Sequence, residues 1–178
     1  ATAIRKNAAW LAAISKERIR DEFSKLLMAG SPAGDPAPAF GTPTDASGIT
    51  AEARFAAVAT NGSTQSWIGM ELLESLGLLG HIVPELEAGI ACTQNKHHVY
   101  TVWEHNCRAL DYAARQGWPL AVRIGALFHD IAKPRAKVGE GPDSTFYGHD
   151  VLGAKMTYQV LSRLRYPEAF IEVDLGTS

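Results

Sequence analysis

Residues 100–150 place the strongest constraint on how this chain can fold. Apolar residues recur at helical spacing from about residue 100 to 115, and again from about 120 to 132. Residues 116–119 (QGWP) separate the two runs with a glycine stop signal and a proline start signal. The pattern therefore predicts two antiparallel helices joined by a tight turn.

Two histidines occupy matching levels on these helices. His105 lies ten positions before Arg115, and His129 lies ten positions after Pro119, so each is about 15 Å from the turn. Antiparallel packing would bring both imidazoles together with the carboxylate of Asp130, a donor set that suits zinc, manganese or iron. The alternative is three polar side chains that are merely hydrogen-bonded. A buried Asp130 without a partner would be costly, which favours the metal site.

A lone histidine followed by an adjacent His-Asp pair on packed helices resembles the HD phosphohydrolase superfamily. The local amino-acid sequence is even more similar to that of the HD domain in the bacterial tRNA nucleotidyltransferases and poly(A) polymerases. The resemblance rests on residues 94–98 (QNKHH), 102–105 (VWEH), 126–134 (ALFHDIAKP) and 146–149 (FYGH), with flanking helical segments at 15–23 and 71–79. That family's nucleotide-adding head, with its Gly-Ser loop and paired carboxylates, is not visible in these residues.

The resemblance implies a mononuclear centre with His105, His129 and Asp130 as ligands of a divalent ion (Mn, Ni, Mg, Fe or Zn). Such sites usually close with a further aspartate on a later helix, and Asp174 is the late candidate. For His149 two interpretations stay open. It either ligates a second metal or contacts the substrate phosphate, or it is hydrogen-bonded to backbone at a helix start.

Cations follow the His-Asp pair closely. Lys133 lies one helical turn beyond Asp130, where an ammonium group can hold a phosphate oxygen, and Arg135 and Lys137 come next. The alternative is a solvated helix end. His98 is expected to contact the metal ligands rather than to bind the metal itself. The residues expected to act in catalysis are Asp130, Lys133 and His149.

The leading hypothesis is a divalent-metal-dependent phosphohydrolase, either a phosphodiesterase or a phosphatase. By resemblance its substrates would be RNA ends, 2′,3′-cyclic phosphates or nucleotides. The alternative is a non-catalytic tRNA- or RNA-binding accessory module that works with a separate nucleotidyltransferase head. A deoxynucleotide triphosphohydrolase would share the metal chemistry, but the local sequence is more similar to the HD domains of the tRNA nucleotidyltransferases and poly(A) polymerases.

The remaining pattern predicts an all-α protein, because no segment alternates long enough to indicate a sheet. We expect three parts. Residues 1–28 form a neck-like helical preface, residues 29–66 a Pro/Gly-rich insertion with a short helix at 51–59, and residues 67–178 the helical HD-domain bundle. Ser15 and Thr50 are expected to cap helices.

Charge, cysteine content and hydropathy place further limits on the class of protein. The net charge of −2 gives no global nucleic-acid signal, so any RNA contact must come from a local patch. Only Cys92 and Cys107 are present, without a paired-cysteine motif, which is typical of a reduced cytoplasmic protein. No apolar run reaches the roughly 18 residues of a membrane span, so no membrane partner is expected.

Overall fold

The computed structural model describes residues 2–30, 50–94 and 99–174, and within them it confirms the all-α prediction, with one isolated bridge between Val138 and Thr145. The η labels mark 3-10 helices, except η4, which is a π-helix. In chain order the elements are α1 (Thr2–Asn7), η1 (Ala8–Ala13), α2 (Lys16–Met28), α3 (Ala51–Thr60), α4 (Gln65–Ser75), α5 (Leu79–Ile82), α6 (Pro84–Glu87), α7 (Val102–Arg115), α8 (Leu120–Phe128), α9 (Lys133–Ala136), η3 (Gly141–Asp143), α10 (His149–Arg163) and η4 (Phe170–Asp174).

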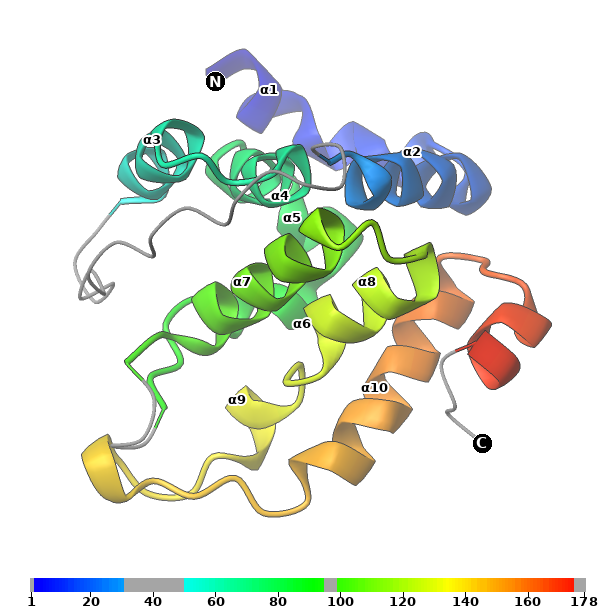
Figure 1. The fold of residues 1–178 in the computed structure, drawn as a ribbon. Helices are drawn as coiled ribbons and strands as arrows, with labels where there is room; N and C mark the ends of the chain where they lie inside the picture. The colour runs from blue at the N-terminus through cyan, green and yellow to red at the C-terminus, as the bar shows by residue number, and fades with distance from the viewer. Residues whose placement is uncertain (1, 31–49, 95–98, 175–178) are drawn as a thin grey trace.

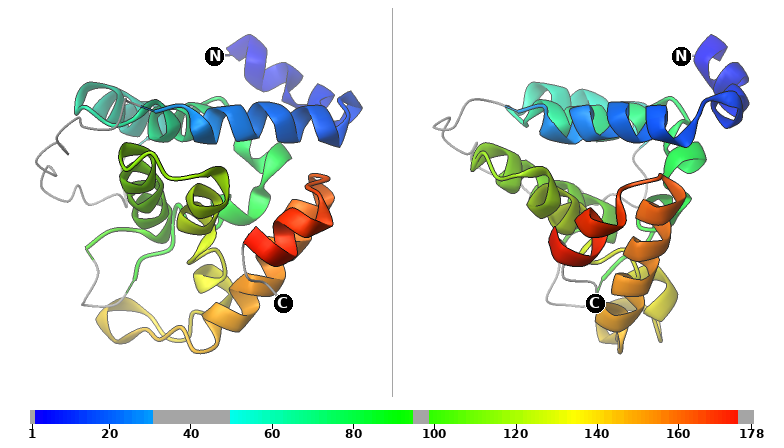
Figure 2. Two further views of the ribbon diagram at one scale, coloured as in Figure 1. Left: turned by 45° about the vertical axis from the view of Figure 1, so that its right-hand side comes forward. Right: turned by 90° about the vertical axis from the view of Figure 1, so that its right-hand side faces the viewer.

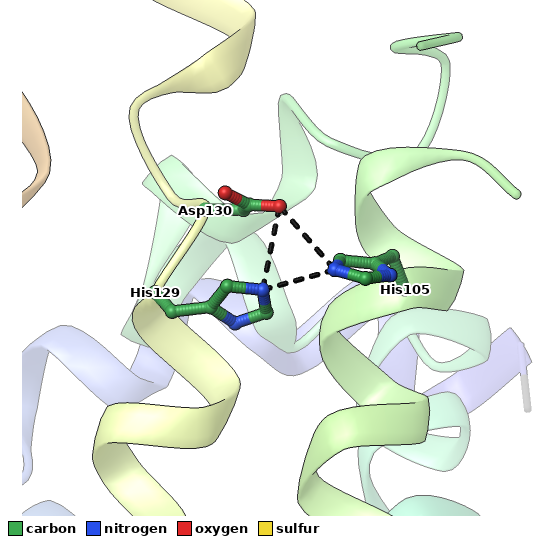
Figure 3. Close-up of side chains that lie close together, drawn as sticks. All are labelled: His105, His129 and Asp130. Atoms are coloured by element: carbon green, nitrogen blue, oxygen red, sulfur yellow. Dashed lines mark hydrogen bonds and ion pairs between the residues drawn. The ribbon is translucent and has the colours of Figure 1, made fainter. Parts of the chain in front are cut away.

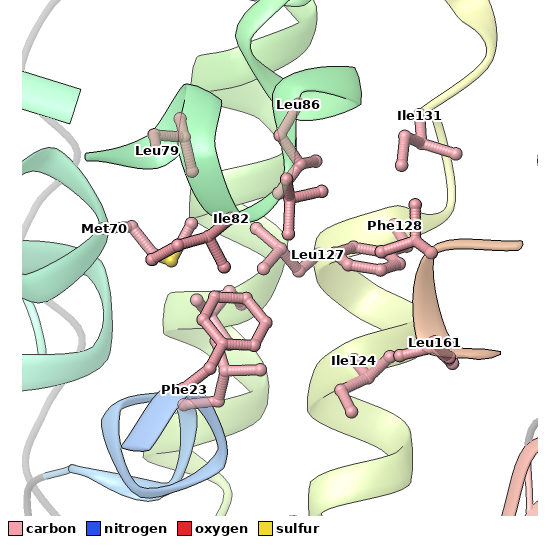
Figure 4. Close-up of a cluster of buried hydrophobic side chains, with 14 of the residues drawn as sticks. Phe23, Met70, Leu79, Ile82, Leu86, Ile124, Leu127, Phe128, Ile131 and Leu161 are labelled. Atoms are coloured by element: carbon pink, nitrogen blue, oxygen red, sulfur yellow. The ribbon is translucent and has the colours of Figure 1, made fainter. Parts of the chain in front are cut away.

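Figures 1 and 2 show α2, α3 and α4 as one layer, with α7, α8 and α10 on the same side of it. The antiparallel pair α7–α8, which the turn signals at residues 116–119 predict, forms the centre of the molecule. Side chains from both layers meet in one hydrophobic cluster (Figure 4), where Phe23 of α2 and Met70 of α4 approach Leu127 of α8. Full burial of each such side chain contributes about 1.5–3 kcal/mol, so this cluster fixes where α7 and α8 lie.

Side-chain caps mark where α2, α3 and α7 begin. The hydroxyl of Ser15 accepts a hydrogen bond from the amide of Arg18, and that of Thr50 accepts one from Ala53, at 3.3 Å in each case. Both caps confirm the sequence prediction. Thr101 does the same for α7 by accepting from the amide of Glu104 at 3.2 Å. Each cap satisfies one amide that has no partner inside its helix.

A buried carboxylate joins α4 to α7 and α3. Glu71 is 2% exposed, and its Oε1 accepts hydrogen bonds from the indole of Trp103 at 2.9 Å and that of Trp67 at 3.2 Å. Arg54 of α3 lies 3.5 Å from its Oε2. Burial raises the pKa of Glu71 although these donors oppose the rise. The network therefore joins α3 and α4 to α7.

Several local expectations need adjustment. Of the helical segment expected at residues 71–79, the part up to Ser75 belongs to α4, and Gly77 with φ +69° supplies the left-handed turn that follows. In the helical preface expected at residues 1–28, the first helix is α-helical only to Asn7 and continues as the 3-10 helix η1. Cys92 and Cys107 are both free.

The predicted division at residues 28 and 66 stays a prediction, and part of the Pro/Gly-rich stretch lies outside the described residues. Three residues of α2 belong to the same hydrophobic cluster as α7, α8 and α10, namely Ile19, Phe23 and Leu27. In the described part of the chain, no helix combines the length and the apolar character needed to cross a membrane.

Candidate metal centre

The level match between α7 and α8 brings two imidazoles and one carboxylate together (Figure 3). The Nε2 atoms of His105 and His129 lie 3.0 Å apart. Asp130 Oδ2 lies 3.4 Å from Nε2 of His105 and 3.3 Å from Nε2 of His129. The three groups expected to converge from their spacing therefore do so.

The end of α8 differs from the expectation, and the difference helps the site. We expected the helix to continue to Ala132, but it ends at Phe128. Pro134 has no amide hydrogen for the carbonyl of Asp130, so the chain tightens into turns in which Ile131 donates to Phe128 and Lys133 to Asp130, both at 3.0 Å. His129 and Asp130 stand in this tight turn, which lets neighbouring side chains face one point.

Backbone carbonyls set the orientation of two imidazoles. Nδ1 of His129 donates to the carbonyl of Ala126 at 2.8 Å, and Nδ1 of His149 donates to that of Phe146 at 2.7 Å. A carbonyl only accepts, so the proton of the neutral ring lies on Nδ1 and Nε2 keeps its lone pair. A histidine that ligates a metal is usually fixed by a bond of this kind.

The three atoms fit a divalent ion. Ligand atoms at about 2.0–2.1 Å from a tetrahedral zinc ion lie about 3.3–3.4 Å from one another. The separations of 3.3 and 3.4 Å match those edges and the third, 3.0 Å, is slightly shorter, while one ligand atom from each residue lies within 4.8 Å of the others. His105, His129 and Asp130 could therefore hold a divalent metal ion without rearranging the helices.

Asp130 has a strongly cationic surrounding. It is 4% exposed, and burial alone would disfavour its charge. The hydrogen bonds and charges of His129 and Lys133 outweigh burial and hold the pKa of Asp130 well below its usual range. Burial lowers the pKa of His129, but Asp130 outweighs this and raises it. The carboxylate is thus kept ionised at neutral pH.

Lys133 is the cation nearest to the centre. Its Nζ lies 2.7 Å from Asp130 Oδ2, donates to Oε1 of Gln94 at 2.7 Å and lies 5.5 Å from the centre of the Phe146 ring. At 7% exposure the ammonium group is nearly covered. Sequence reasoning missed Gln94 and Phe146 as its partners, since neither bears a spacing relation to Lys133.

The other predicted cations are placed differently. Lys137 donates to the hydroxyl of Thr93 at 3.2 Å and lies 3.4 Å from a carboxylate oxygen of Glu140. Arg135 lines a separate cavity with Pro84, Glu85 and Met156. Lys137 therefore lies along the segment that carries Gln94, while Arg135 belongs to another face of α9.

His149 does reach the site. Its Nε2 lies 3.5 Å from Asp130 Oδ1, the oxygen that does not face His105 and His129. The helix-start interpretation also describes it, because it opens α10 and bonds a backbone carbonyl. His98 lies outside the described residues. The backbone of Asp174 falls in η4, but its side chain is likewise outside what is described.

Comparisons with known proteins agree with this geometry. Residues 102–173 match the family described as "HD domain", and this range contains His105, His129 and Asp130. Residues 1–34 match the family described as "Probable RNA and SrmB- binding site of polymerase A". The chain carries an HD domain and is homologous to the C-terminal part of the CCA-adding tRNA nucleotidyltransferases. This confirms the resemblance stated from the sequence.

Two relatives show the extent of the homology. The A-adding tRNA nucleotidyltransferase of Deinococcus radiodurans is 39% identical over 109 residues, which is 58% of this chain and 25% of that protein. The CC-adding tRNA nucleotidyltransferase of Thermus thermophilus is 35% identical over 117 residues, which is 62% of this chain and 26% of that protein. The matches thus span about a quarter of the length of each relative.

A third relative carries a broader name. The "Multifunctional CCA protein" of Chromobacterium violaceum is 36% identical over 97 residues, which is 53% of this chain and 23% of that protein. No solved structure matches the chain.

Proposed function

We propose that this chain is a divalent-metal-dependent phosphohydrolase of the HD type that acts on RNA ends, 2′,3′-cyclic phosphates or nucleotides. The observation that carries the proposal is the triangle formed by two imidazole nitrogens and one carboxylate oxygen, with edges of 3.0, 3.3 and 3.4 Å. The side chains of His105 and His129 are 32% and 39% exposed, so a phosphate can approach from solvent.

A divalent ion held by this triangle would lower the pKa of bound water toward about 7 and polarise a phosphoryl oxygen. Asp130 stays ionised because Lys133 and His129 surround it, so it can orient an attacking water molecule. His149 presents Nε2 toward the same carboxylate and can hold or give a proton at that atom. These roles make Asp130 and His149 the proposed catalytic residues.

Two lysines have different proposed roles. The ammonium group of Lys133 is already engaged by Asp130 and Gln94, so its first role is to hold Asp130 in its charged form. It reaches a substrate phosphate only by exchanging one of these partners. Lys137, one helical turn further along, is the second phosphate contact that we propose.

The first test compares two histidine variants for metal content and turnover. We expect the EDTA-stripped chain to bind one Mn²⁺ in a calorimetric titration and then to hydrolyse 2′,3′-cyclic AMP. His129→Ala should weaken Mn²⁺ binding by more than the roughly 10–100-fold that loss of an outer-shell partner costs, and should abolish turnover. The exposed His81 on α5 gives a matched control, and His81→Ala should change neither property. Equal metal binding and turnover in the two variants would contradict the proposal.

A second candidate function is an RNA-binding accessory module. It is favoured by the match of residues 1–34 to the RNA-binding family and by the tRNA nucleotidyltransferase relatives. The basic side chains of α1 and α2 that would meet an RNA backbone include Lys6, Lys16 and Arg18. Nucleotide addition is what the names of the relatives describe, and it is not part of this proposal.

Salt dependence tests the RNA interaction directly. We expect tRNA binding, measured by fluorescence anisotropy, to weaken steeply with salt because Lys and Arg release counterions from the phosphates. Replacing Lys6, Lys16 and Arg18 together by alanine should reduce the log–log salt slope by about 2–3, roughly one unit for each phosphate that a removed cation neutralises. His129→Ala should leave tRNA binding unchanged. If the triple substitution leaves the salt slope unchanged, Lys6, Lys16 and Arg18 do not form the RNA-binding surface.

A further inference from the structure

A single exposed aromatic residue stands between two residues that face the metal centre. Phe146 lies under the ammonium group of Lys133, and His149 faces Asp130 at 3.5 Å. Tyr147 lies between them in the chain, yet it is 85% exposed. Gly148, with φ +71°, turns the backbone directly after it, a conformation that a glycine adopts without strain. Tyr147 therefore stands on the rim of the site.

Packing does not account for the aromatic ring. Gly148 caps α10, so Tyr147 precedes the cap, a position from which an apolar side chain often packs back onto the first turns of the helix. An exposure of 85% shows that this contact does not bury Tyr147. Two other large apolar side chains on the adjoining segments are also solvent-facing, Val138 at 66% and Val151 at 61%. Tyr147 therefore offers an exposed aromatic face beside the site.

We propose that Tyr147 is a specificity-determining residue that stacks on the nucleobase attached to the phosphate held at the metal centre. This inference rests on the proposed phosphate site formed by His105, His129 and Asp130. The base of a 3′-nucleotide lies one ribose away from its phosphate, and Tyr147 lies two residues from His149. Stacking needs a base with a free face, as in single-stranded RNA, so the proposed substrate class is a single-stranded RNA 3′ end or a free nucleotide.

The test compares two ligands that differ only in the base. Calorimetry with the Mn²⁺-loaded chain measures the affinities of adenosine 3′-monophosphate and of ribose 3-phosphate. The wild-type chain should prefer the nucleotide by about tenfold, the size of one stacking contact. Tyr147→Ala should abolish this preference and leave the affinities for ribose 3-phosphate and for Mn²⁺ unchanged. Tyr147→Phe should retain the preference.

Tyr112, which is 52% exposed on α7 beside Trp118, provides the control. Tyr112→Ala should keep the full preference for the nucleotide. Equal affinities for the two ligands in the wild-type chain, no measurable binding of either, or a preference that survives in Tyr147→Ala would each overturn the inference. Hydrolysis of 2′,3′-cyclic AMP is measured separately. Base-dependent binding without turnover would count against the phosphohydrolase and would leave the stacking role of Tyr147 supported.

Discussion

Asp130→Ala is expected to lose both metal binding and stability, because Asp130 has two partners of different kinds. It would supply the carboxylate oxygen of the proposed metal site, and it lies 2.7 Å from the ammonium group of Lys133. The side chains of the pair are only 5% and 9% exposed. Breaking a buried ion pair by removing one partner costs about 3–5 kcal/mol, since the other charge is left uncompensated.

Thermal unfolding with Mn²⁺ and with EDTA measures both effects in one assay. Asp130→Ala should unfold roughly 6–20 °C below the wild-type chain in EDTA and should show no rise in Tm with Mn²⁺. The double substitution Asp130→Ala/Lys133→Met removes the stranded charge, so it should recover most of the stability but not the metal-dependent rise. Lys133→Met alone should keep that rise. If the double variant is no more stable than Asp130→Ala, the ion pair is not the cause of the loss.

The metal triangle could be predicted because its geometry follows from short-range rules. Helical periodicity predicts a helix at each histidine, although His129 lies just after the end of α8, and the signals at residues 116–119 make the helices antiparallel. Equal distances from the turn then determine the level, and the observed Nε2 separation of 3.0 Å agrees. Pro134 is the sequence signal for the end of α8, because it lacks an amide hydrogen. We nevertheless expected the helix to continue to Ala132, and it ends at Phe128.

Contacts between distant segments could not be predicted in the same way. Lys133 meets Gln94, which is 39 positions away, and Trp103 meets Glu71, which is 32 positions away. Spacing along a helix says nothing about which other element covers that face. The exposure of Tyr147 likewise depends on how the segment before α10 turns at Gly148. Such partners follow from packing of the whole bundle, which a single sequence does not reveal.

Arg123 carries a buried charge, and no sequence pattern predicts its burial. It lies on α8 and is 4% exposed. Its guanidinium donates to three backbone carbonyls, those of Trp118 at 2.8 Å, Leu27 at 2.9 Å and Ala114 at 3.4 Å. Leu27 and Ala114 lie in the last turns of α2 and α7, where carbonyls lack partners within their own helix and a cation is favourable. Arg123 thus joins the segment matched to the RNA-binding family to the HD helices.

Arg123→Met is expected to lower the free energy of unfolding by about 2–4 kcal/mol, because it removes the three hydrogen bonds that the buried guanidinium donates. Arg123→Lys should lose an intermediate amount, since one ammonium group cannot reproduce the planar fork of the guanidinium. Chemical denaturation measures these changes, and the exposed Arg18→Met, within about 0.5 kcal/mol of the wild-type chain, is the control. The Mn²⁺-dependent rise in Tm should persist in Arg123→Met, because its contacts lie apart from His105, His129 and Asp130. A variant that matches Arg18→Met in stability would show that these three hydrogen bonds do not hold α2 against the bundle.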